Sequence, residues 1–164
     1  MTFSLDWAYA YGSPAATATI RRSPEDFFVD EVMGFEPDGD GQHLMLHIEK
    51  RNTNTEWLAR QLAKFVNIKP MDVGFAGLKD RNAVTTQWFS VRIPGIDEPD
   101  WSQFDTEDYQ VLEAKRHGRK LRRGTLKGNR FVIVVRKLDG DLTSLEQRLK
   151  TIKQHGIPNY FGEQ

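Results

Sequence analysis

The chain contains no cysteine, and this absence removes several kinds of chemistry at once. Without thiols there can be no disulfide, no thiolate nucleophile and no cysteine-ligated zinc or iron–sulfur site. The chain also lacks any run of about 18 apolar residues, the length that a membrane-spanning helix needs. Its first residues carry neither the positive flank nor the apolar stretch of a signal peptide. These absences predict a soluble cytoplasmic protein whose chemistry comes from other side chains.

Motifs for common cofactors and metals are missing as well. There is no phosphate-binding loop of the nucleotide-hydrolase type and no glycine-rich dinucleotide fingerprint. His43 and His47 would share a strand face, but no third ligand accompanies them, so we assign no metal site. Residues 38–41 resemble the start of a calcium loop without its distal glutamate, which favours a hairpin turn. The sequence therefore implies no cofactor and no metal ion.

Charge is balanced in number but not in position. The chain has 23 basic and 23 acidic residues, yet residues 115–130 hold eight Lys or Arg and no acidic residue. This leaves 15 basic residues against 23 acidic ones in the rest of the chain. A concentrated positive charge favours a polyanionic partner. The alternative is a solvated loop without a binding role.

Apolar residues make up 38% of the 164 residues and include ten Phe, which is enough for a packed core. Alternating or β-branched patterns predict strands at 15–22, 27–35, 44–48, 84–93, 109–117 and 130–138. We expect the second and third strands to pair through the turn at 37–41. The continuous apolar run at 131–135 should lie centrally in a sheet.

Helical spacing of apolar residues predicts two helices. A capping box at 53–56 precedes a helix that runs to about Val66, and Pro70 could begin a further helical turn. A second capping box at 143–146 precedes a helix that Gly156 should end. Strands in hairpins with helices between them predict an α+β fold, with a mainly antiparallel mixed sheet and flanking helices.

One acidic residue has a position that suits catalysis. Asp80 lies in an irregular connection, residues 77–82, just before a predicted strand and between Lys79 and Arg81. Nearby positive charge can keep such a carboxylate ionised, and it can then act as a nucleophile or a base. The alternative is a turn aspartate that hydrogen-bonds to its own backbone.

Two short segments combine basic and aromatic residues in a way that suits RNA. Asn129 could read a base edge and Phe131 could stack on a base, although a turn residue and a core residue are the alternatives. Arg21 and Phe27 form a weaker pair of the same kind. It is weaker because acidic residues lie close by, and an exposed strand edge explains the segment equally well; they are Glu25, Asp26, Asp30 and Glu31.

Four segments resemble, in order, motifs of the TruD family of tRNA pseudouridine synthases. They are SPEDFFV at 23–29, GLKDRNAVTTQ at 77–87, KGNRF at 127–131 and PNYFGEQ at 158–164. They span nearly the whole chain, and the segment around Asp80 is highly specific. The resemblance implies that residues 1–164 are the N-terminal part of a pseudouridine synthase catalytic domain. Because the family's last motif continues past Gln164, we expect a fragment that lacks the TRUD insertion domain and the rest of the catalytic domain.

The resemblance also implies a reaction, the isomerisation of uridine-13 of tRNA to pseudouridine without cofactor or metal. The base must leave its stack before its glycosidic bond is cleaved and the base is rotated and rejoined through carbon. Asp80 matches the family's catalytic aspartate, which either attacks the sugar or removes a ribose proton.

The remaining site residues follow from the same resemblance. Phe27 and Asn129 match substrate-binding positions, and Phe131 is expected to stack on the uracil. Arg21 and Lys79 are the candidates for the basic residue that pairs with the catalytic aspartate. The expected partner is tRNA, with no membrane contact, and we expect a monomer because the RNA supplies a large binding surface.

Two other functions stay open at this stage. A fragment with a basic segment could be a non-catalytic RNA-binding module. A different base-directed enzyme is the other alternative: a glycosylase would release free uracil, and a zinc deaminase is disfavoured by the lack of cysteine.

Overall fold

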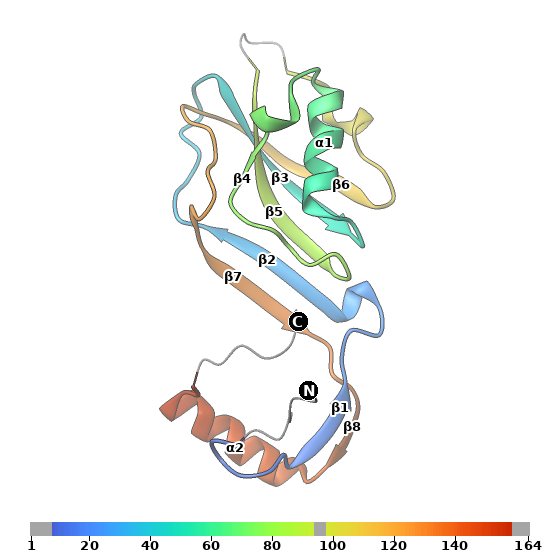
Figure 1. The fold of residues 1–164 in the computed structure, drawn as a ribbon, viewed down its shortest axis with the longest axis vertical. Helices are drawn as coiled ribbons and strands as arrows, with labels where there is room; N and C mark the ends of the chain where they lie inside the picture. The colour runs from blue at the N-terminus through green and yellow to red at the C-terminus, as the bar shows by residue number, and fades with distance from the viewer. Residues whose placement is uncertain (1–7, 94–97, 159–164) are drawn as a thin grey trace, which may run out of the picture. The chain divides into compact units, whose positions relative to one another are not determined.

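The structure, a computed structural model, describes residues 8–93 and 98–158 (Figure 1). It divides the chain into two compact units, each of which is described by itself below. The larger unit is Ile20–Val134, and the smaller one combines Met1–Thr19 with Val135–Gln164. Within the described residues no helix has both the length and the apolar character needed to cross a membrane.

The larger unit is built on a six-stranded sheet whose strand order is β6-β3-β5-β2-β7, with β4 paired to β5. All strand pairs are antiparallel except β2 and β5, which run parallel. The predicted α+β fold with a mainly antiparallel mixed sheet is therefore confirmed. The strands are β2 (Phe27–Met33), β3 (His43–Arg51), β4 (Gly74–Phe75), β5 (Val84–Arg92), β6 (Tyr109–His117) and β7 (Leu126–Ile133).

Two predictions about strand placement were wrong. β2 and β3 do not form a hairpin, because β5 lies between them and pairs with both. β5 is buried along almost its whole length and therefore takes the central position. The apolar run at 131–135 does not lie centrally either: β7 is the last strand of the sheet, and its Phe131, Val132 and Ile133 are all about half exposed.

The main core lies between one face of the sheet and α1 (Thr55–Phe65), which Figure 1 shows beside β3, β5 and β6. Leu58 and Leu62 of α1 are fully buried, and each contributes about 1.5–3 kcal/mol by leaving water. They pack against inward-facing residues of the sheet, namely Leu44, Leu46, Ile48, Phe89 and Val91. The helix cap is one residue later than predicted, since the Asn54 side chain accepts hydrogen bonds from the amides of Glu56 and Trp57.

The opposite face of the sheet carries a smaller cluster of Met45, Ala76, Trp88 and Leu121. Leu121 belongs to the loop 118–125, which lies close against β4. A Cβ atom at Gly74 would stand 2.3 Å from the carbonyl oxygen of Leu121, so only glycine fits there. Three short 3₁₀ turns complete the unit: η1 (Pro24–Asp26), η2 (Pro70–Asp72), which confirms the turn predicted at Pro70, and η3 (Trp101–Gln103).

The smaller unit consists of a two-stranded antiparallel sheet and one helix. β1 (Ala16–Thr19) pairs with β8 (Arg136–Gly140), and α2 (Leu142–His155) follows. The helix begins after Asp141, whose carboxylate accepts hydrogen bonds from two backbone amides, rather than at the predicted cap Thr143. It ends at Gly156 as predicted, with a φ of 72° that glycine adopts without strain.

Candidate active site

Asp80 stands on the predicted irregular connection, immediately before β5. Its side chain is 47% exposed, and one carboxylate oxygen lies 3.7 Å from Nη1 of Arg21, which is 44% exposed. An ion pair this open to water adds little to stability. Its effect is to place a cation beside a carboxylate that a substrate could reach.

Arg21 is held in an unusual backbone conformation. Its φ of 57° lies in the left-handed region, which a residue other than glycine adopts only when neighbouring structure requires it. The next residue braces the turn, because the amide of Arg22 donates a hydrogen bond of 3.1 Å to the buried carboxylate of Asp26. The guanidinium of Arg21 then lies over the ring of Phe27, 3.9 Å from its centroid. Such stacking fixes the orientation of the planar cation that faces Asp80.

Phe131 adds a second aromatic ring next to Phe27. Their centroids are 5.9 Å apart, Phe27 is 5% exposed and Phe131 is 53% exposed. The two strands are in antiparallel register, with Val29 opposite Phe131 and Glu31 opposite Asn129. Phe131 and Asn129 therefore share the face of Phe27, and both are exposed. Phe131 is not a core residue, and Asn129 lies within β7 rather than in a turn.

Lys79 is buried, although it adjoins the half-exposed Asp80 in sequence. Its ammonium forms an ion pair with the carboxylate of Glu31, and the two side chains are only 5% and 0% exposed. The other Glu31 oxygen accepts a hydrogen bond of 3.1 Å from the backbone amide of Trp88. Glu31 is thus a buried counter-ion, and the interpretation of β2 as an exposed edge was wrong because the strand lies between β5 and β7.

A buried polar network, which the sequence reasoning missed, lies beneath the Asp80 connection. Its main members are Lys50 of β3, Thr55 at the start of α1 and Gln87 of β5, all at most 1% exposed. Burial lowers the pKa of Lys50 to about 8; the nearby Asp80 charge partly opposes this shift and Lys79 adds to it. The signal was present in the sequence, since the alternation of inward-facing residues in β3 continues from Ile48 to Lys50.

The predicted basic segment is folded onto the sheet rather than being a free loop. Its ends belong to β6 and β7, and several of its cations have partners in the described structure. Lys115 pairs with Glu113, Arg116 with Glu98, and Lys120 donates to the carbonyl oxygen of Met71. Arg123 lies over the ring of Phe75 and 3.8 Å from Glu56.

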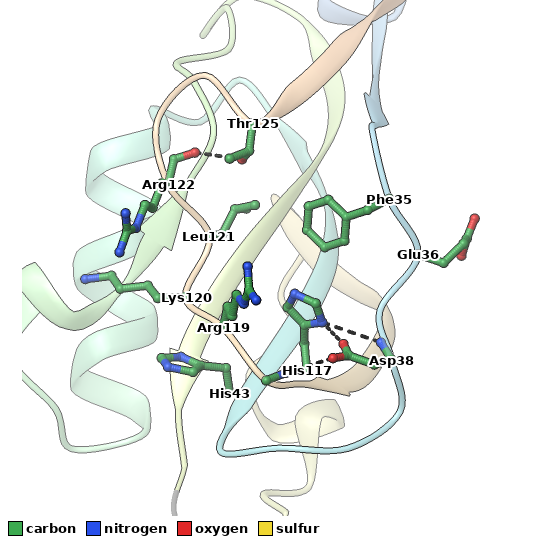
Figure 2. Close-up of a pocket in the computed structure, with 11 residues that line it drawn as sticks. Phe35, Glu36, Asp38, His43, His117, Arg119, Lys120, Leu121, Arg122 and Thr125 are labelled. Atoms are coloured by element: carbon green, nitrogen blue, oxygen red, sulfur yellow. Dashed lines mark hydrogen bonds and ion pairs between the residues drawn. The ribbon is translucent and has the colours of Figure 1, made fainter.

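A cavity of about 970 Å³ lies between this loop and the connection that precedes β3 (Figure 2). Within it His117 stacks on Phe35, with centroids 5.0 Å apart, and contacts the carboxylate of Asp38. Burial lowers the pKa of His117, and the charge of Arg119 lowers it further. None of the six residues predicted for the active site lines this cavity, so it is a separate feature. Among the described residues there is no group of three or more His, Cys, Asp or Glu that could hold a metal ion.

Comparison with known proteins identifies the family of the chain. The family model of tRNA pseudouridine synthase D (TruD) matches residues 7–164. The chain is 53% identical over 159 residues to tRNA pseudouridine synthase D of Methylococcus capsulatus, covering 97% of the chain and 45% of the relative. It is 51% identical over 166 residues to that of Cellvibrio japonicus, covering 99% and 49%.

A crystal structure from Methanosarcina mazei, assigned as tRNA pseudouridine synthase D (TruD), superposes with a TM-score of 0.72 at 30% identity. The match covers 88% of this chain and 34% of that one. The chain therefore spans about half the length of the curated relatives it matches and a smaller share of the archaeal structure. On the family match, these identities and the shared fold, the chain belongs to the tRNA pseudouridine synthase D (TruD) family.

Proposed function

We propose that this chain forms the catalytic surface of an enzyme that isomerises uridine in tRNA to pseudouridine, with uridine-13 as the target. Residues 1–164 would then be part of a pseudouridine synthase catalytic domain. The observation that carries the proposal is the half-exposed carboxylate of Asp80, 3.7 Å from Arg21, whose guanidinium stacks on Phe27 next to the exposed ring of Phe131. The names of the relatives support the reaction class.

The reaction breaks the bond between N1 of uracil and C1′ of the ribose and forms a bond between C5 and C1′. C5 loses its proton and N1 ends with one, so the mass of the RNA is unchanged. Asp80 either attacks C1′ or removes a ribose proton to start the cleavage. In both routes the target nucleotide has to be turned out of its stack to reach the carboxylate.

The neighbouring residues would hold the base once it has left the stack. Phe131 offers an exposed ring for stacking, and Asn129 offers an amide on the same strand face. The ring of Phe27 contacts both the ring of Phe131 and the guanidinium of Arg21. Arg21 is the basic partner of Asp80 in this proposal, whereas Lys79 contributes from the interior through its ion pair with Glu31.

The direct test is release of tritium from C5-labelled uridine in tRNA. It is measured with the chain and with a hybrid protein in which residues 1–164 replace the matching 45% of the Methylococcus capsulatus relative. We expect release by the hybrid, and none when Asp80 is changed to Asn with tRNA binding retained. Release by Asp80→Asn at the wild-type rate would remove Asp80 from the mechanism. Failure of the unmodified hybrid on every tRNA would overturn the enzymatic proposal.

A non-catalytic RNA-binding role is the second candidate, and one observation favours it. In the described structure the side chains of Arg119 and Arg122 line the cavity of Figure 2 without an ion-pair partner, so they are free to meet phosphates. This role predicts salt-sensitive RNA binding with no modified nucleotide. A glycosylase would release free uracil and lower the mass of the RNA, which mass spectrometry separates from isomerisation.

A further inference from the structure

Buried side chains from three different elements hold the backbone of the Asp80 connection. Lys50 of β3 donates from Nζ to the carbonyl oxygen of Asp80, at 3.0 Å, and to that of Thr53, at 2.7 Å. Thr55 accepts a hydrogen bond of 3.1 Å from the amide of Lys79. Gln87 donates to the carbonyl oxygen of Gly77, at 3.3 Å.

Two of these side chains are also hydrogen-bonded to each other. The hydroxyl of Thr55 also donates to Oε1 of Gln87, at 2.9 Å, so the two side chains orient each other. The hydrogen bonds from Lys50 to Thr53 and from Thr55 to Gln87 are buried, and the three that reach the connection are partly buried. Hydrogen bonds in such a low-dielectric environment are expensive to leave unmade. The connection carries no regular secondary structure, and it is therefore fixed by these side chains rather than by a helix or a strand ladder.

We propose that Lys50 is a positioning residue for the reaction, because its ammonium clamps the peptide group of the residue that carries the reactive carboxylate. The proposal deepens the function assigned to Asp80 above and depends on it. Among the described residues the ammonium of Lys50 hydrogen-bonds to backbone carbonyl oxygens only, and it would not touch the substrate.

The location of Lys50 argues against a role in packing alone. The residue is fully buried near the end of β3, in register with Thr85 on one side and Tyr109 on the other. Enclosing an ammonium in this way costs free energy that an apolar side chain of the same length would not incur. This cost is offset by two charge-assisted hydrogen bonds, one of which joins β3 to the Asp80 backbone.

Loss of the Lys50 hydrogen bonds would change the position of the Asp80 carboxylate. The carbonyl group of Asp80 is attached to the same Cα atom as the side chain, so rotation of this peptide group moves the carboxylate. The carboxylate must stay beside Arg21, whose guanidinium is fixed separately by Phe27. A displacement of about 1 Å in a catalytic group can reduce a rate about a hundredfold.

The charge state of Lys50 provides a signature that simple packing would not give. Burial lowers its pKa to about 8. The titratable or charged groups around it are Asp80, Lys79 with its partner Glu31, and Tyr109 on β6. Lys50 is therefore charged at neutral pH and loses its charge in mildly alkaline solution, which weakens the clamp.

The first arm of the test measures structure without activity. The carbonyl carbons of Asp80 and Thr53 are followed by NMR in the ¹³C-labelled chain between pH 6 and 10. We expect both signals to shift with one midpoint near 8, and the shift to be absent in Lys50→Met. The amides of residues 77–82 should exchange with solvent faster in Lys50→Met while those of α1 remain protected. Unchanged exchange and no common titration would overturn the proposal whether or not the chain is an enzyme.

The second arm measures single-turnover tritium release and tRNA affinity in the hybrid protein. Lys50→Met should lower the rate about tenfold to a hundredfold, with affinity within about twofold of the parent, and remove the decline in rate above pH 8. Lys50→Arg keeps a charge at all these pH values and should recover part of the rate. The matched control is Lys64→Met on the exposed side of α1, which should change nothing. A folded Lys50→Met protein that works at the parent rate would refute the positioning role, whereas an active Asp80→Asn protein would instead refute the proposed function.

Discussion

Nη1 of Arg21 lies 3.7 Å from Oδ1 of Asp80, and each side chain remains nearly half exposed. At this distance and exposure the pair is screened by water and salt, so its contribution is orientation rather than stability. The contact joins the turn before β2 to the connection before β5, and these two strands run side by side in parallel.

Replacing Arg21 should affect the reaction far more than the fold. We expect Arg21→Ala to lower the rate of tritium release about tenfold to a hundredfold, while the free energy of unfolding changes by less than about 1 kcal/mol. Arg21→Lys keeps the charge but loses the planar stacking on Phe27, and should be intermediate. Arg22→Lys is the matched control, because the described contact of Arg22 uses only its backbone amide. Equal rates for Arg21→Ala and Arg22→Lys would contradict the pairing.

Breaking the buried ion pair of Glu31 and Lys79 should lower the stability of the fold far more than replacing Arg21 does. Glu31→Gln leaves the ammonium of Lys79 without its counter-ion, which should reduce the free energy of unfolding by about 3–5 kcal/mol in urea titration. Adding Lys79→Met should restore much of this loss, because the ammonium left without its counter-ion is then removed. Glu25→Gln, which breaks the exposed pair with Arg51, should cost less than about 1 kcal/mol. A similar cost for both single variants would show that the Lys79 pair is solvated.

Lys50 should give the chain a distinctive dependence of stability on pH. Its pKa is about 8 in the folded state and lies near 10.5 in the unfolded chain, so between these values the unfolded state binds more protons. Stability relative to Lys50→Met should therefore rise with pH from about 8 to 10, with a slope of at most about 1.4 kcal/mol per pH unit. Below pH 7 the difference between the two proteins should be constant. Urea titrations at several pH values measure it, and a flat difference throughout would contradict the burial of the ammonium.

Replacing Phe27 should mainly lower stability, whereas replacing Phe131 should mainly weaken substrate binding. Phe27 is buried, so Phe27→Ala should cost about 3–5 kcal/mol of stability. Phe131→Ala removes a half-exposed ring and should cost less than about 1 kcal/mol. Loss of base stacking should nevertheless weaken the interaction of Phe131→Ala with the target nucleotide by about 1–3 kcal/mol. Single-turnover rates set against thermal unfolding distinguish the two effects.

The loop 118–125 should contribute to RNA affinity through Arg119 and Arg122, which have no ion-pair partner among the described residues. We expect Arg122→Ala to weaken tRNA binding and to reduce the salt dependence by about one ion equivalent. Combining it with Arg123→Ala should add a stability cost, because Arg123 also contacts Phe75 and Glu56. Glu36→Gln at the same cavity is a control that removes a negative charge instead. The measurement is tRNA affinity from about 50 to 300 mM salt, a range over which such salt dependences are determined. A salt dependence that is unchanged in Arg122→Ala would contradict this role.

Local sequence patterns predicted most elements of the larger unit, although the single strand predicted at 130–138 is divided between β7 and β8. The strand predicted at 109–117 is β6 without change, and the helix predicted from Thr55 to Val66 is α1 with one residue fewer. These patterns depend on side chains a few residues apart, which the sequence displays directly. The irregular connection that carries Asp80 was predicted for the same reason, since Gly77 interrupts any regular pattern before it.

Pairing between distant strands was beyond these patterns. The turn at 37–41 favoured a hairpin of β2 and β3, but β5 lies between them because its side chains are buried on both faces. The burial of Lys50 and Glu31 was not predicted, for a related reason. Lys50 and Glu31 have the residue types of exposed positions, and their burial depends on partners 30 to 57 residues away that only the folded sheet brings close.

The left-handed backbone of Arg21 has a further consequence, for how this position can change. A non-glycine residue held at a φ of 57° carries about 1–3 kcal/mol of conformational strain. Glycine would relieve that strain and at the same time delete the guanidinium that faces Asp80. Selection for robustness and selection for turnover therefore favour different residues at this position. Under the proposed function, arginine at this position gives up some stability and keeps a cation beside Asp80.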